Sequence, residues 1–213
     1  MTQILVIAKR PLPGRVKTRL TPPYTPEQAA GLARAALRDT LTAVSRTPAR
    51  RRVVALDGPP GPYVPFGFDA VRQRGDGLDE RLAHAFDDAH ARCPAPVLLI
   101  GMDTPQVTPS LLTAAVRALD ASDAVIGPAE DGGFWLLGLR RPEPALLRGV
   151  PMSSPGTGAA QHERLLRAGL RVFVAPALRD VDTAPDVDAV AARIPGSAFA
   201  AAHAHLAVPE PTA

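Results

Sequence analysis

Hydrophobic and polar positions repeat with two different periods along this chain. Short apolar runs that end in turn residues predict strands at 4–8, 51–58, 69–75, 96–103, 124–131, 133–140 and 171–175. Longer stretches with apolar residues three and four positions apart predict helices at 25–46, 78–92, 109–120, near 159–168 and after Thr183. Strands and helices therefore alternate from one end of the chain to the other.

Capping residues mark where two of these helices begin. Thr25, Pro26 and Gln28 have the spacing of a capping box with proline at the first helical position. Thr108 and Pro109 are likewise an N-cap threonine followed by proline at the first helical position. The boundaries of both helices are thus predicted independently of their hydrophobic periodicity.

The alternation predicts an α/β fold with a mostly parallel central sheet and helices on both faces. The continuous apolar run at 96–103 is typical of a strand buried at the centre of such a sheet. No linker or internal repeat divides the chain, so we expect one domain over 1–203 and a flexible tail over 204–213. In such folds ligands bind beyond the carboxyl ends of the strands.

Composition narrows the classes of function. Hydrophobic residues make up 46% of the 213 residues and aromatic residues only 4%, so the core is expected to be built from Ala, Val, Leu and Ile. A net charge of +3 without a long basic tract argues against a nucleic-acid partner. The single cysteine, Cys93, excludes a disulfide framework. No apolar stretch is long enough for a membrane span or a signal-peptide core, so we expect a cytoplasmic protein.

The first strand runs into a strongly basic loop, residues 8–20, with the sequence AKRPLPGRVKTRL. Its five cationic residues are Lys9, Arg10, Arg15, Lys17 and Arg19, and the two lysines are the only lysines of the chain. Such side chains face either water or an anion, because an unpaired buried charge is costly. Ala8 to Arg19, with Gly14 allowing close backbone approach, fit the oxygens of a nucleotide polyphosphate. The spacing of a Walker loop is absent.

Carboxylates follow two other predicted strands. Asp103 comes directly after the central strand, and Asp180 and Asp182 come after the last one. Mg²⁺ (or Mn²⁺) is commonly held by one or two carboxylates together with water and substrate phosphates. Asp103 and Asp182, with Asp180, are therefore candidate metal ligands. The alternatives are that Asp103 caps a turn and that Asp182 or Thr183 caps the last helix, with Asp186 completing a capping box.

Two glycine-containing segments are candidates for contacts with other parts of the ligands. Asp131, Gly132 and Gly133 lie between two strands, where they form either a hairpin turn or a surface that approaches the acceptor substrate. The segment from Gly75 to Asp79 enters a helix. Gly75, Asp76, Gly77 and Asp79 are predicted to lie near a nucleotide base, and the alternative is that Asp76 or Asp79 caps that helix.

Five motifs, in order along the chain, resemble one family of the glycosyltransferase-A (GT-A) superfamily. They are AKRPLPGRVKTRL, GDGLDERL, IGMDTPQVT, GPAEDGGFWLLGL and DVDTAPDV, and the resemblance covers about residues 3–190. Members carry labels such as "putative glycosyltransferase" and "selenodomain-associated transferase". More distantly, KTRL at 17–20 is similar to a motif of 2-phospholactate guanylyltransferases, and the layout resembles the molybdenum-cofactor and methylerythritol-phosphate nucleotidyltransferases.

The resemblance implies a Rossmann-like nucleotide-diphospho-sugar transferase fold in which Asp103 and Asp182 or Asp180 bind metal and the basic loop wraps a triphosphate. The Asp-x-Asp typical of metal-dependent glycosyltransferases is absent, since this chain has Asp103 followed by Thr104 and Pro105.

We therefore predict a nucleotidyltransferase that moves an NMP from an NTP onto a small phosphorylated or carboxylated acceptor. Lys17, Arg19 and Asp103 would be catalytic. The alternatives are a GT-A glycosyltransferase using an NDP-sugar and a nucleotide-binding protein without catalysis. The base, the acceptor and the oligomeric state are not predicted.

Overall fold

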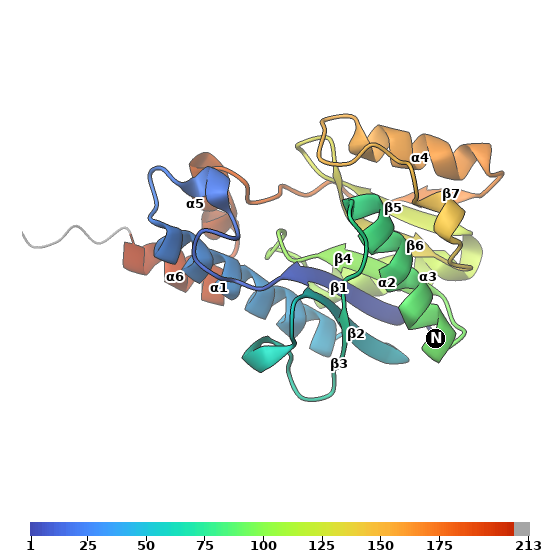
Figure 1. The fold of residues 1–213 in the computed structure, drawn as a ribbon, viewed down its shortest axis with the longest axis horizontal. Helices are drawn as coiled ribbons and strands as arrows, with labels where there is room; N and C mark the ends of the chain where they lie inside the picture. The colour runs from blue at the N-terminus through green and yellow to red at the C-terminus, as the bar shows by residue number, and fades with distance from the viewer. Residues whose placement is uncertain (207–213) are drawn as a thin grey trace, which may run out of the picture.

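The computed structural model describes residues 1–206 and is built around a seven-stranded sheet (Figure 1). The strands are β1 (Gln3–Lys9), β2 (Arg51–Asp57), β3 (Asp69–Arg72), β4 (Val97–Gly101), β5 (Ala124–Pro128), β6 (Phe134–Leu139) and β7 (Val172–Val174). Their order across the sheet is β3-β2-β1-β4-β6-β5-β7, and β6 alone among them runs antiparallel to its neighbours. The predicted mostly parallel sheet is confirmed.

Six α-helices and three short 3-10 helices connect these strands in the described residues. They are α1 (Pro26–Ser45), α2 (Leu78–Arg92), α3 (Pro109–Ala121), α4 (Thr157–Arg167), α5 (Ala184–Arg193) and α6 (Ala198–Leu206), with 3-10 turns at Thr18–Leu20, Gly61–Tyr63 and Pro144–Leu146. The capping box of Thr25 and Gln28 is present, and the Thr108 side chain accepts from the backbone N–H of Leu111. No helix of residues 1–206 is long and apolar enough to cross a membrane.

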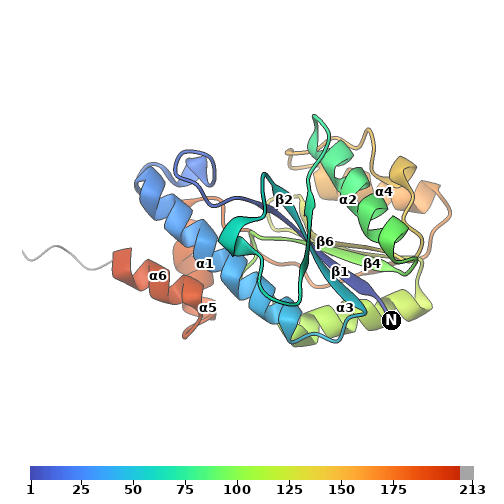
Figure 2. The ribbon, with the colours of Figure 1, turned by 60° about the horizontal axis from the view of Figure 1, so that its bottom comes forward.

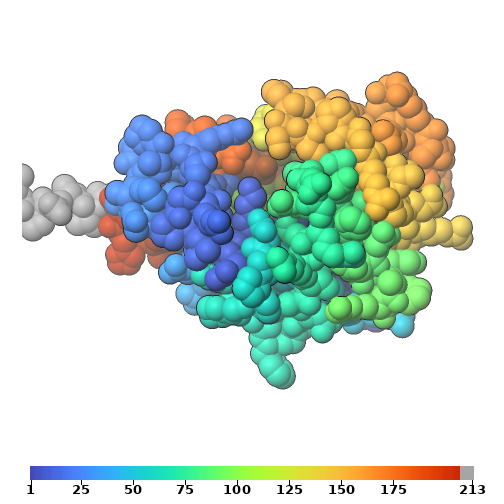
Figure 3. Space-filling view, viewed as in Figure 1, coloured from blue at the N-terminus to red at the C-terminus, as the bar shows by residue number. Residues whose placement is uncertain are grey.

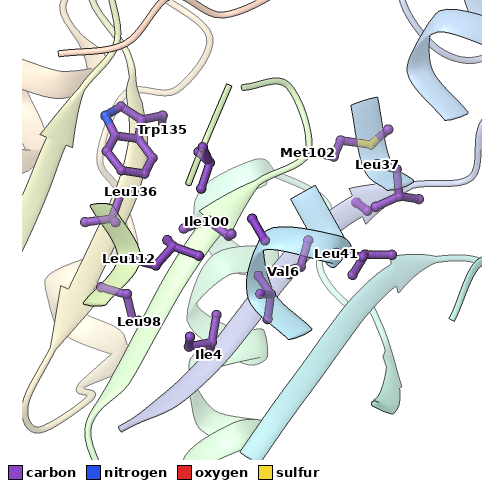
Figure 4. Close-up of a cluster of buried hydrophobic side chains, with 14 of the residues drawn as sticks. Ile4, Val6, Leu37, Leu41, Leu98, Ile100, Met102, Leu112, Trp135 and Leu136 are labelled. Atoms are coloured by element: carbon purple, nitrogen blue, oxygen red, sulfur yellow. The ribbon is translucent and has the colours of Figure 1, made fainter. Parts of the chain in front are cut away.

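Helices cover both faces of the sheet (Figure 2). Successive residues of a strand point to opposite faces, so each apolar strand presents side chains that helices can bury on both sides. Ile4, Val6 and Ala8 of β1 pack with α1 and α3, whereas Leu5 of the same strand packs with α2 and α4. Val6 lies between Val54 of β2 and Ile100 of β4. Figure 4 shows the α1–α3 side of this core, where aliphatic side chains and one tryptophan, Trp135, fill the layer.

The last helix, α6, was not predicted. Its sequence, AFAAAHAHL, is apolar almost all round, so it lacks the stripe that marks an amphipathic helix. It packs with α5 against the outer side of α1, where Phe199 is fully buried. The predicted flexible tail, 204–213, thus begins inside a helix, and residues 207–213 lie outside the described residues.

A carboxylate of α1 caps α6. Asp39 accepts hydrogen bonds from the backbone N–H groups of Ala198 (3.0 Å) and Phe199 (2.7 Å). Asp39→Ala leaves both donors without this partner, so we expect it to lower the free energy of unfolding by about 1–2 kcal/mol. Urea unfolding measures this loss. Asp120→Ala, which removes an exposed carboxylate of α3, should be nearly neutral, and equal effects of the two variants would contradict the capping role.

Candidate active site

A cleft of about 810 Å³ lies beyond the carboxyl ends of β1 and β4. We call it the main cleft. Its walls come from the basic loop, the start of α2, the residues after β4, the β5–β6 turn, the loop before α4 and the segment after β7. Figure 3 shows blue, green and yellow-orange segments meeting on this face of the molecule. Segments that are far apart in sequence thus share one cavity, as expected at the strand ends of an α/β sheet.

Lys17 occupies the centre of the charged groups in the main cleft. Its Nζ lies 2.6 Å from Oδ1 of Asp103 and 3.1 Å from Oδ1 of Asp182. Arg19 Nη1 lies 3.4 Å from the other oxygen of Asp182. The Lys17 side chain is 8% exposed, whereas that of Arg19 is 73% exposed. The structure therefore brings together the predicted catalytic cations and two of the predicted metal ligands.

The local backbone holds Lys17 in this position. Lys17 has a φ of 50° and a ψ of 39°, the left-handed conformation that residues other than glycine seldom adopt, and it begins the 3-10 turn Thr18–Leu20. Buried Val16 and Leu20 anchor the chain on either side. Strain of this kind costs on the order of 1–3 kcal/mol and persists where surrounding contacts impose it, which often occurs at functional sites.

The charge of Lys17 is stabilised by its neighbours. Burial lowers the pKa of the ammonium, but the charges of Asp103 and Asp182 and their hydrogen bonds more than offset this, so the net shift is upward. Lys17 therefore remains a cation in the pH range in which proteins are stable.

The two carboxylates are positioned by the ends of β4 and the segment before α5. The backbone N–H of Val181 donates to the carbonyl of Asp103 (2.9 Å), which ties these two segments together. Of the alternatives left open by the sequence, Thr183 caps α5 with Asp186 as its partner. The side chain of Asp182 is thus not needed for the cap and pairs with Lys17.

Asp180 lies in the same cleft with an unusual environment. Its Oδ1 is buried without a hydrogen-bond partner in the described structure. Burial and the nearby negative charges of Asp103 and Asp131 raise the pKa of Asp180 to about 7. Because the folded protein holds this proton more tightly than the unfolded chain, stability contributed by protonated Asp180 is present below the ordinary pKa near 4 and is lost as the pH rises towards 7.

We expect Asp180→Asn to change how stability depends on pH. In the wild type, deprotonation of Asp180 should lower the free energy of unfolding by on the order of 2–4 kcal/mol between about pH 4 and 7. The variant should not show this decrease. At pH 8 in chelator-containing buffer it should be more stable than the wild type. Urea unfolding at a series of pH values measures both, and parallel pH profiles for the two proteins would contradict the assignment.

The carboxylates fit a hard divalent cation. Asp103 and Asp182 both contact one cationic atom, Lys17 Nζ, which shows that their oxygens can converge on a single positive charge. Oxygen ligands of this kind suit Mg²⁺ and Mn²⁺. Asp180 adds a buried oxygen without a partner. No group of three Asp, Glu, His or Cys side chains within residues 1–206 is arranged to hold a metal alone, so substrate oxygens would have to complete the coordination.

The β5–β6 turn forms another wall of the main cleft. Asp131 and Gly133 line the main cleft, and the carboxylate of Asp131 accepts from the backbone N–H of Gly133 (2.8 Å). Gly132 has a φ of 89°, and a Cβ placed on it would lie 1.9 Å from the carbonyl oxygen of Pro155. The segment is therefore a hairpin turn that also lines the cleft, and its contact with an acceptor stays a prediction.

The loop before α4 lines the cleft beside this turn. Ser153, which has a φ of 57°, and Ser154 contribute to the lining. The Pro-, Ser- and Gly-rich run before the helix is the sequence signal for this loop. Gln73 was not identified from the sequence. Its amide donates to the carbonyls of Ala8 and Ala55, which fixes the end of β1.

Only some of the other residues that were predicted to contact the nucleotide line the main cleft. Ala8, Lys9 and Asp76 line the main cleft with Lys17 and Arg19. Arg10 lines a neighbouring hollow, which Lys9 also borders. Gly14, Gly75, Gly77 and Asp79 line neither cavity; Gly77 precedes α2, and Asp79 accepts from the backbone N–H of Gly149 (2.8 Å).

Solved structures share this fold. A "putative nucleotide-diphospho-sugar transferase" from Desulfovibrio desulfuricans G20 is 29% identical over 96% of this chain and 94% of that one, with a TM-score of 0.87. A CMP:2-keto-3-deoxy-manno-octonic acid synthetase complexed with CTP is 16% identical, covering 89% and 96%, with a TM-score of 0.58. Rv0371c of Mycobacterium tuberculosis H37Rv, in complex with manganese, is 20% identical, covering 89% and 96%, with a TM-score of 0.56.

These likenesses confirm the predicted Rossmann-like nucleotide-diphospho-sugar transferase (GT-A) fold. The distant similarities inferred from the motifs, to guanylyltransferases and molybdenum-cofactor enzymes, stay predictions. No protein with a curated description matches the chain. A family model described as "uncharacterized protein conserved in bacteria (DUF2064)" matches residues 33–154, more than half of the chain, and the protein belongs to that family.

Proposed function

We propose that this protein is a metal-dependent nucleotidyltransferase, which moves an NMP from an NTP onto a small acceptor and releases pyrophosphate. The observation that carries the proposal is the position of Lys17, buried between Asp103 and Asp182 at the end of the basic loop. The pairing of a cationic loop with carboxylates that follow β4 and precede α5 suits a triphosphate and its metal ion. The nucleotide-using enzymes that share the fold, one of them complexed with CTP, support it.

The lining of the main cleft suggests how an NTP would lie in it. The base would contact the Gly75–Asp79 segment through Asp76, and the phosphates would lie along Lys9, Lys17 and Arg19. A phosphorylated or carboxylated acceptor would lie beside Asp131–Gly133 and the Ser153 loop. Mg²⁺ or Mn²⁺, when held by Asp103 and Asp182 with Asp180 nearby, would supply Lewis-acid activation of a phosphate oxygen.

The residues of the chain would then act by positioning and charge stabilisation. An acceptor oxygen forms a bond to the α-phosphorus while the bond from that phosphorus to the α–β bridging oxygen breaks. The electron pair of the broken bond leaves with pyrophosphate. Lys17 and Arg19 stabilise the charge on the reacting phosphate, and Lys9 with Arg10 holds the leaving group. No covalent intermediate on the protein is required.

A GT-A glycosyltransferase acting on an NDP-sugar is the second candidate. The 29%-identical structure, described as a nucleotide-diphospho-sugar transferase, favours it. The sequence after β4, Asp103-Thr104-Pro105, lacks the second aspartate of an Asp-x-Asp motif. A diphosphate also needs fewer cations than the departure of pyrophosphate, and the basic loop supplies five.

A paired assay separates the two reactions. Purified protein with Mg²⁺ or Mn²⁺ is given each of the four NTPs and a pool of phosphorylated and carboxylated acceptors, and pyrophosphate is measured. A parallel panel of NDP-sugars is assayed for NDP. We expect metal-dependent pyrophosphate release with one NTP and none in Asp103→Asn. NDP release without pyrophosphate would replace this proposal by the glycosyltransferase, and silence in both panels would overturn catalysis of either kind.

A further inference from the structure

A second hollow, of about 590 Å³, lies beside the main cleft at the ends of β1, β2 and β3. We call it the basic hollow and define it by its charged lining residues: Lys9, Arg10, Arg15, Arg72, Arg81 and Asp57. Three of these cations come from the basic loop, one from β3 and one from α2. The sequence analysis had assigned no role to Arg72, or to Arg81 within the motif GDGLDERL.

The cations of the basic hollow are mostly unpaired. In the described part of the chain Lys9, Arg10, Arg15 and Arg72 form no ion pair, and the pair of Arg81 with Asp57 is long, at 3.4 Å. Five cations against one carboxylate leave a formal charge of +4. The main cleft differs, because Asp76, Asp103, Asp131, Asp180 and Asp182 offset its cations.

Arg10 gives the hollow a buried polar group without a partner. Its Nε is shielded from solvent and makes no hydrogen bond within residues 1–206. The side chain passes over Gly58, where a Cβ would lie 2.8 Å from Arg10 Cδ, so the loop after β2 leaves room for it. A buried guanidinium N–H without an acceptor is costly, and a bound anion would remove that cost.

We propose that the basic hollow is a phosphate-binding site in which Arg10 and Arg72 are the principal ligands. Guanidinium groups from separate segments can donate several charge-assisted hydrogen bonds to the oxygens of one phosphate. Lys9 and Arg81 line both cavities, so the bound phosphate lies next to the main cleft. It belongs either to the distal end of a nucleotide in that cleft or to a separate small phosphorylated molecule.

Pyrophosphate and inorganic phosphate are the probes. Calorimetric titration in metal-free, low-salt buffer should show that the wild type binds pyrophosphate, and that Arg10→Ala and Arg72→Ala each weaken binding by about tenfold or more. Arg34→Ala, an exposed arginine of α1, is the matched control and should leave binding unchanged. Circular dichroism checks that each variant is folded. Absence of binding in the wild type, or wild-type affinity in both hollow variants, would overturn the site.

Two further titrations identify where the phosphate comes from. If it is part of the nucleotide, Arg72→Ala should weaken binding of NTPs but not of the corresponding NMPs, and NTP and pyrophosphate should compete. If it is a separate molecule, pyrophosphate should still bind to protein saturated with NTP. Only the assignment of the phosphate to the nucleotide rests on the proposed function. If the protein binds pyrophosphate through Arg72 but shows no turnover, the phosphate site is retained and the nucleotidyltransferase proposal is rejected.

Discussion

Lys17→Met is expected to reduce turnover by about 100-fold or more, in whichever transfer assay the wild type is active. The substitution removes the one cation that contacts both Asp103 and Asp182, and methionine keeps much of the length of the buried stem. Loss of a single preorganised group that stabilises developing charge commonly costs 10²–10³ in rate. Asp103→Asn, which retains the shape of the carboxylate, should have a comparable effect.

The thermal stability of Lys17→Met, with and without metal, distinguishes a role of Lys17 in the site from general misfolding. Without Lys17, the carboxylates of Asp103, Asp180 and Asp182 lack their central counter-charge, so the melting temperature should fall in chelator-containing buffer. Added Mg²⁺ should restore part of this loss, and more of it than in the wild type. The exposed Arg34→Ala serves as control for both readouts. Full turnover in Lys17→Met would contradict the proposed role of Lys17 in stabilising charge on the reacting phosphate.

Gly158→Ala is expected to destabilise the protein by about 1–3 kcal/mol, although alanine ordinarily stabilises a helix relative to glycine by about 1 kcal/mol. Gly158 lies in the first turn of α4, and a Cβ there would meet the backbone carbonyl oxygens of Gly133 at 2.3 Å and Gly132 at 3.0 Å. Neither atom can rotate away. The added methyl group must therefore separate α4 from the β5–β6 turn and widen the side of the main cleft that this turn lines.

Gly156→Ala is the matched control for this prediction. Gly156 precedes α4 by a single position, its φ is −98°, and a Cβ there would meet no atom within 4 Å. Urea unfolding of both variants, together with the KM for the acceptor, tests the prediction. Gly156→Ala should be close to neutral, and Gly158→Ala should raise the KM as well as lower stability. A stabilised Gly158→Ala would show that the turn and helix are not in this contact.

Much of the fold followed from local patterns. The run at 96–103 and the capping box at Thr25 gave β4 and the start of α1, because burial and capping leave a direct trace in neighbouring residues. Helix α6 left a weaker trace, since its mostly apolar sequence has no periodic stripe. Its local cap is Ser197, whose hydroxyl accepts from the backbone N–H of Ala200, and its second cap, Asp39, comes from another helix. Long-range caps of this kind cannot be found from spacing.

The candidate site was predictable by residue type but not by arrangement. Asp103, Asp182 and Lys17 were each identified from their positions after strands, yet only the tertiary structure shows that the lysine lies between the carboxylates. The basic loop was expected to surround one ligand. In the structure, Arg10 and Arg15 line the basic hollow together with Arg72, whereas Lys17 and Arg19 pair with Asp182.

The ion pair between Lys17 and Asp182 joins positions 165 residues apart. Leu20, at the end of the 3-10 turn that follows Lys17, packs in a cluster with Val187 and Phe199 of the C-terminal helices. On a ribosome, β1 to β4 could pair while the remainder of the chain is still being synthesised, but the lysine would have only Asp103 as a partner until Asp182 and the C-terminal helices had emerged. Nascent chains of this protein would therefore acquire much of the sheet early and the complete set of cleft residues only near the end of translation.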